Sequence, residues 1–156
     1  MAEFTKNDVQ LVGSNQPITL NTTIGCNKGY VYHRNGSGIV TLRGVTPHCF
    51  ARYLVTFCGN IAVPSTGTVG PIAVSLAIDG EPILTSRAIV TPAAVAANPP
   101  TTDNFFCVTS TAIITVPRCG YLNVSVRNVS ESADPTTTPE PSILVQNANM
   151  TVSRIA

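Results

Sequence analysis

The stretch VSLAIDGEPI, residues 74–83, decides the fold, because it has the pattern of two short strands joined by a tight turn. Asp79-Gly80 is a favoured pair for a type I′ hairpin, in which both central residues need positive φ. A catalytic carboxylate would need a second group held beside it, and Glu81, a neighbouring strand position, diverges from Asp79. The stretch therefore predicts a hairpin turn at Asp79 and Gly80, not an acidic site.

Alternation with a period of two recurs along the chain, and no window of 11 residues shows a helical period. The run from Cys49 to Cys58 places one set of apolar side chains on a single side: Ala51, Tyr53, Val55 and Phe57. Further strands are expected near 9–12, 17–24, 29–33, 38–43, 61–63, 83–90, 105–116 and 143–155. About ten short strands separated by glycine and proline turns predict an all-β, antiparallel β-sandwich.

The last expected strand changes its apolar face. Ile143 and Val145 have odd numbers, whereas Ala148, Met150 and Val152 have even numbers. An extra residue is needed for such a change, so we expect a β-bulge near Gln146–Asn149.

The composition excludes several classes of protein. At 156 residues the chain has about the length of one domain, with a net charge of +1 and 11% charged residues, which does not favour nucleic acid as a partner. No apolar run reaches the length of a membrane span, and no secretory signal is visible at the start. We therefore expect no nucleic-acid partner and no membrane partner.

Candidate chemistry is sparse. The five cysteines, an odd number without a C-x-x-C pair, predict reduced thiols rather than zinc ligands or a full disulfide framework: Cys26, Cys49, Cys58, Cys107 and Cys119. His48 and Cys49 are neighbours on an expected strand, where side chains point oppositely, so a thiolate–imidazole dyad is not favoured. We expect no enzyme activity, no catalytic or metal-binding residues and no cofactor.

Two proline-rich stretches, 91–104 and 130–142, are too long and too rich in proline to be strand interiors. They fit solvated connections at an end of the sandwich or contacts with a neighbouring molecule, and the sequence leaves both interpretations open.

Several segments together resemble a known family: VQLVGSNQPITLNTTIGCNKGYVYHRNGSGIVTLRG, RYLVTFCGNIAV, VSLAIDGEPI, LNVSVRN and ILVQNANMTVSRIA. They are similar to the tumour-necrosis-factor/C1q-like jelly roll, in the variant found at the C-terminus of collagen-like bacterial spore-surface proteins and in small phage or prophage structural proteins. The resemblance implies a jelly roll of ten strands, compact trimers and no catalytic residues. We expect a flexible segment over residues 1–7 and one jelly-roll domain over 8–156.

The resemblance departs from the spore-surface proteins in one respect, because no Gly-X-Y stalk precedes the domain in this sequence. This favours a virion component assembled in the host cytoplasm, namely a homotrimeric decoration protein on the outside of a phage capsid, bound to the major capsid protein. Two alternatives stay open: a spore or cell-surface layer protein, and a fibre-tip module that binds a glycan or a receptor.

Two sets of contact residues follow from this hypothesis. Candidate trimer contacts are the small residues of one strand face, Ala73, Ser75 and Ala77, together with Tyr53 and Phe57. The candidate capsid anchor is the N-terminal segment formed by Met1, Ala2, Glu3, Phe4, Thr5, Lys6 and Asn7. Its deletion would abolish capsid binding and leave the trimer folded.

Overall fold

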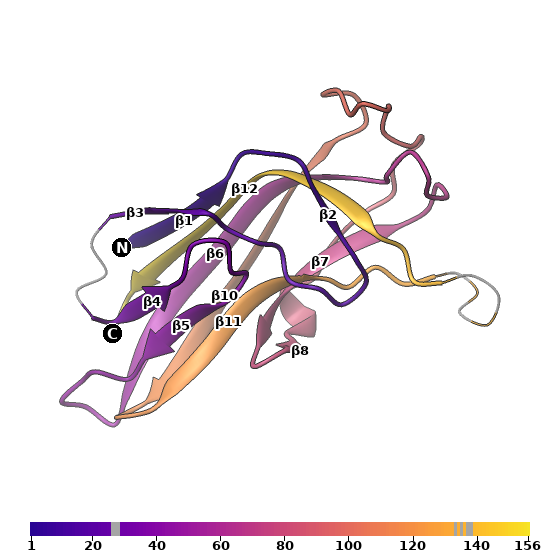
Figure 1. Cartoon of the computed structure of the whole chain (residues 1–156). Helices are drawn as coiled ribbons and strands as arrows, with labels where there is room; N and C mark the ends of the chain where they lie inside the picture. Colours follow the sequence, from indigo (N-terminus) through magenta and orange to yellow (C-terminus); the bar gives the residue numbers. More distant parts are fainter. Residues whose placement is uncertain (26–28, 133, 135, 137–138) are drawn as a thin grey trace.

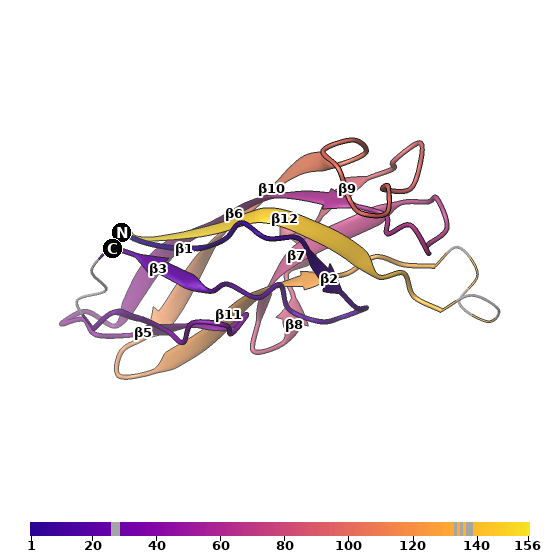
Figure 2. The same cartoon turned by 45° about the horizontal axis from the view of Figure 1, so that its top comes forward.

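Two antiparallel β-sheets pack face to face in the computed structural model, which describes residues 1–25, 29–132, 134, 136 and 139–156 (Figures 1 and 2). Sheet A contains β1 (Ala2–Lys6), β2 (Gln10–Val12), β3 (Thr22–Ile24), β6 (Phe50–Ala62), β10 (Phe106–Pro117) and β12 (Ile143–Arg154). Sheet B contains β4 (Val31–His33), β5 (Val40–Arg43), β7 (Ile72–Ile78), β8 (Glu81–Pro82), β9 (Ala88–Val90) and β11 (Tyr121–Asn128). The predicted all-β sandwich is confirmed.

The order of the strands brings distant parts of the chain together. Sheet A runs β10-β6-β12-β1-β3, with β2 also paired to β12, and sheet B runs β4-β5-β11-β7-β8, with β9 also paired to β7. Both termini lie at one end of the sandwich, and the stretch 91–104 and residues 130–132 and 139–142 lie at the other (Figure 1).

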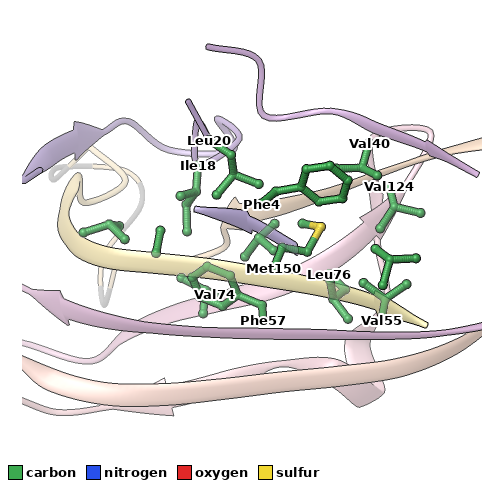
Figure 3. Close-up of a cluster of buried hydrophobic side chains, with 14 of the residues drawn as sticks. Phe4, Ile18, Leu20, Val40, Val55, Phe57, Val74, Leu76, Val124 and Met150 are labelled. Carbon is green, nitrogen blue, oxygen red and sulfur yellow. The ribbon is translucent and has the colours of Figure 1, made fainter. Parts of the chain in front are cut away.

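The core fills the space between the two sheets (Figure 3). Phe4, Phe57 and Met150 from sheet A meet Leu76 and Val124 from sheet B, and none of the five is more than 1% exposed. Burial of one large apolar side chain stabilises the fold by about 1.5–3 kcal/mol. The alternation of apolar residues seen in the sequence therefore builds one continuous core.

The described part of the chain has twelve strands, where about ten were expected. Of the predicted strand 83–90 only residues 88–90 form a strand, β9, because a single turn of 3-10 helix, η1 (Leu84–Ser86), lies between β8 and β9. The hydroxyl of Ser86 accepts the backbone N–H of Leu76 at 3.1 Å, so this turn closes the edge of β7 between the two short strands.

The predicted bulge in the last strand is confirmed. The register of β12 against β6 shifts between Gln146 and Asn149, and Asn147 within it has φ of 53°. The shift turns Ala148, Met150 and Val152 toward the core after Ile143 and Val145. One chain segment can thus keep its apolar side chains inside along its whole length.

The expectation that residues 1–7 form a flexible segment was wrong. Residues 2–6 form β1, which lies between β12 and β3 and pairs with both. Ala2 is 3% exposed and Phe4 is fully buried, so the segment contributes to the core. The domain therefore begins at the first strand and not near residue 8.

Candidate functional site

The acidic stretch around Asp79 is a turn in the structure. Asp79 and Gly80 have φ of 48° and 92°, and Ile78 pairs with Glu81 across the hairpin, as a type I′ turn requires. The Asp79 carboxylate accepts the backbone N–H of Asn123 at 3.1 Å. Its role in this structure is to hold the hairpin against β11.

Tyr53 and Phe57 lie inside the sandwich, which corrects their prediction as trimer contacts. Both side chains have 0% exposure. The hydroxyl of Tyr53 donates to the carbonyl oxygen of Arg43 at 2.6 Å, and burial raises the pKa of Tyr53 above its ordinary value. Alternation placed these residues correctly on one face of their strand, but that face is the core of the single chain.

Ala73, Ser75 and Ala77 are also buried, with at most 1% exposure, so they offer no side-chain surface to another subunit. The hydroxyl of Ser75 donates to the carbonyl of Ile83 at 2.8 Å and lies 3.1 Å from the hydroxyl of Ser86. The small residues of β7 are therefore covered by the chain's own segments.

The proposed anchor lies on β1, so its side chains are divided between two environments. Ala2 and Phe4 point into the core, while Glu3 and Thr5 alternate with them and are half-buried on the other side. Strand pairing and core packing hold these residues in place, so they cannot leave the domain to bind a capsid.

The outer side of sheet A is open over the middle of its strands, whereas at one end Ala96 covers Ala62 and Leu144. We call the central part of this side the sheet-A face. It consists of nine outward side chains in three rows, each row crossing β10, β6 and β12 in that order. The rows are Ile113, Leu54, Ser153; Thr111, Thr56, Thr151; and Thr109, Cys58, Asn149. Leu54 is 37% exposed and Ile113 is 63% exposed, and they lie directly opposite each other. Uncharged side chains in every one of these nine positions make it a weakly polar surface.

The sequence contained part of this signal. Phe50 and Leu54 stand on the side of their strand opposite Tyr53, so the alternation already assigned them to the other face. The alternation did not show that β6 pairs with β10, and this pairing is what places Ile113 beside Leu54.

Two thiols meet at one end of the same side of sheet A. The Sγ atoms of Cys58 and Cys107 are 3.7 Å apart, and both residues are exposed. Contact with the Cys58 thiol raises the pKa of the Cys107 thiol. Cys49 and Cys119 are also exposed and unbonded, whereas Cys26 lies outside the described residues.

An open hollow of ≈ 570 Å³ lies where β6 begins, near the chain termini. It is lined by Pro47, His48, Cys49, Phe50, Arg118 and Ala156. The Arg52 guanidinium lies 4.9 Å from the centre of the Phe50 ring, which is 41% exposed. An aromatic ring flanked by arginines is a common composition for a protein contact.

Among the described residues, no group of three or more histidine, cysteine, aspartate or glutamate side chains is placed to hold a metal ion. Within the same part of the chain, no helix is long and apolar enough to cross a membrane.

Comparison with known proteins relates the fold to solved structures. No protein-family model and no curated protein matches this chain. The globular domain of zebrafish complement 1qA is similar over 99% of this chain and 97% of that one, with a TM-score of 0.53 and 12% identity. The CBM22-1 xylan-binding domain of Paenibacillus barcinonensis Xyn10C covers 99% of this chain and 87% of its own, with a TM-score of 0.34 and 8% identity.

A third structure, CBM35 from Cellvibrio japonicus Abf62, has a TM-score of 0.31 and 16% identity, with 96% of this chain and 99% of that chain covered. Of the three, the complement 1qA domain has a TM-score that supports a shared fold. The chain therefore has a C1q-like jelly-roll fold.

Proposed function

We propose that this protein is a non-enzymatic structural protein of a phage virion, a homotrimer that decorates the outside of the capsid by binding the major capsid protein. The observation that carries the proposal is the sheet-A face, a broad uncharged surface left open on a rigid sandwich. Protein interfaces are depleted of charged residues at their centre, as this face is.

The sheet-A face is the proposed trimer contact, in place of the buried residues that were expected from the sequence to form it. Leu54 and Ile113 form an exposed apolar pair in one row of this face, and the threonine hydroxyls of the next row can pair with polar groups of a second subunit. The number three comes from the resemblance of the sequence to the C1q-like family. A trimer also suits a local three-fold position of an icosahedral lattice, where one building block meets three equivalent subunits.

The position on the outside of a capsid agrees with the charge of the chain. A net charge of +1 gives little attraction to the phosphate of packaged DNA. A virion assembled in the host cytoplasm is also consistent with the four exposed, unbonded cysteines.

We assign the capsid contact to the end of the sandwich that carries the hollow. Phe50 and Arg118 line this hollow, and Arg52 lies against the Phe50 ring. Aromatic and arginine side chains carry much of the binding energy in protein interfaces. Because β1 is held within sheet A, we propose Phe50, Arg52 and Arg118 as the capsid contact instead of the N-terminal segment.

Light scattering at micromolar concentration tests the self-association. We expect the mass of a trimer for the wild-type protein and the mass of a monomer for Leu54→Glu, since a carboxylate within the contact would lose its hydration on association. Leu84→Glu is the matched control, because Leu84 is 74% exposed and lies outside sheet A. A monomeric wild-type protein would refute the trimer.

Particles purified from the source organism test the location. We expect mass spectrometry to find the protein in the particles and labelled electron microscopy to place it on heads. Sedimentation with undecorated heads should show weaker binding by Phe50→Ala/Arg118→Ala, while light scattering still gives a trimer. Labelling at a tail tip would refute the capsid assignment, and undiminished binding by the double variant would refute the hollow as the contact.

A further inference from the structure

Cys58 and Cys107 occupy neighbouring strands of sheet A and point to the same side. Cys58 pairs with Thr109 and Cys107 pairs with Asn60, so the two cysteines are diagonal neighbours in the β6–β10 ladder. Their Sγ atoms are 3.7 Å apart. A disulfide has an S–S length of about 2.05 Å, so each sulfur would need to move by roughly 0.8 Å toward the other.

The surroundings leave the pair open to reagents. Both residues are exposed, and they lie beside Asn60 and Thr109 rather than in the core. Cys58 is itself one of the nine residues of the sheet-A face, and the strand spacing places it about 13 Å along β6 from Leu54. The contact between the two thiols is made within one chain, so the inference does not rest on the proposed function.

The geometry points to a modification site: Cys58 and Cys107 form an intrachain disulfide that joins β6 to β10 when a low-molecular-weight disulfide is present. One thiolate attacks a sulfur of oxidised glutathione, and one glutathione leaves as its thiolate. The second cysteine, as its thiolate, then attacks the cysteine sulfur of the mixed disulfide and releases the second glutathione. Two protein thiols are oxidised, and one glutathione disulfide is reduced to two glutathiones.

The sequence makes the test straightforward. Cleavage after lysine and arginine places the five cysteines on separate peptides, which span residues 7–28, 44–52, 53–87, 88–118 and 119–127. The folded, full-length protein is incubated with oxidised glutathione, the remaining thiols are blocked, and the digest is analysed without reductant. We expect peptides 53–87 and 88–118 to appear linked, with the loss of two hydrogen atoms.

Matched variants separate proximity from general reactivity. In Cys107→Ser the linked peptide should disappear and Cys58 should carry glutathione, and Cys58→Ser should give the reverse. Cys49→Ser removes an exposed cysteine elsewhere and should leave the link unchanged.

Stability gives a second readout, because the link closes a long loop of the unfolded chain. Oxidation should raise the Tm of the wild-type protein by several degrees and leave the Tm of Cys107→Ser unchanged within error. Wild-type protein in which Cys58 and Cys107 stay free, or each carry a separate glutathione, would overturn the proposal. A link from either residue to Cys49 or Cys119 would overturn it as well.

Discussion

The outer side of sheet B is covered by parts of the same chain over β7 and the adjoining half of β11, whereas the sheet-A face is open. On sheet B, the guanidinium of Arg127 donates to the carbonyl of Asn15 at 2.7 Å and lies close to the turn at Gly80. Ser75 and Ser125 on that side are 0% and 3% exposed. On sheet A, Leu54 on β6 and Ile113 on the edge strand β10 stay exposed. Two sheets of one sandwich thus differ mainly in what lies over their outer sides.

This difference has a consequence for function. A covered face contributes to the stability of the single chain, and an open, uncharged face is available to another subunit. The residues that matter for folding and those that matter for assembly are therefore expected to separate between the two sheets.

Removal of residues 1–7 should have the largest effect, since it takes β1 out of sheet A. The loss of the buried Phe4 side chain alone corresponds to about 3–5 kcal/mol, and the pairing with β12 and β3 is lost with it. A domain of typical stability would not remain folded. We expect near-UV circular dichroism to show no native signal, while removal of Met1 alone, which is 82% exposed, leaves it intact.

Replacement of Arg127 tests whether this side chain shields the outer side of sheet B from water. Arg127→Ala removes the hydrogen bond to Asn15 and opens the buried small residues to water, and we expect a loss of about 1–3 kcal/mol in the free energy of unfolding. Arg127→Met retains the apolar stem and should lose less. Urea unfolding measures both variants, and an unchanged midpoint for Arg127→Ala would show that the arginine is not a cover.

High pH tests the core beneath sheet A through Tyr53. Burial raises the pKa of Tyr53 above its ordinary value of 10.0, so the unfolded chain releases this proton at a lower pH than the folded chain. The resulting stability is complete below pH 10 and is lost as the pH rises from there through the folded pKa. Tyr53→Phe should lose less stability over this range than the wild type.

Tyr121→Phe serves as the control for this experiment, because Tyr121 is 66% exposed. Urea unfolding at several pH values above 10 should give it the same decline as the wild type. Equal slopes for wild type and Tyr53→Phe would contradict the role assigned to burial.

Leu54→Ser should have the smallest effect on the single chain. Leu54 lies on the open face, and surface substitutions of this kind usually change the free energy of unfolding by no more than about 0.5 kcal/mol. The measurement is made by unfolding at a dilution where light scattering shows monomers. A loss above about 2 kcal/mol would mean that this face is packed within the chain and is not open.

Much of the fold could be predicted from local patterns. The alternation along residues 72–78, the Asp-Gly turn and the change of parity around Asn147 gave the sandwich, the hairpin and the bulge. These features depend on residues close together in the chain, where side-chain alternation and the φ preference of glycine act directly. The strand at residues 2–6 was missed because its two strand partners lie far away in the sequence, at 22–24 and 148–152.

The sequence by itself determined which residues alternate inward and outward along each strand, including Tyr53 inside and Leu54 opposite to it. Only the tertiary structure decided which outward side chains stay exposed. Ser75 is covered because Ile83 and Ser86 lie against it, and Leu54 is open because no described segment crosses that part of sheet A. Alternation is a property of one strand, whereas exposure depends on every segment that packs nearby. For the same reason the approach of Cys58 to Cys107 follows from the pairing of β6 with β10, which joins residues far apart in the chain.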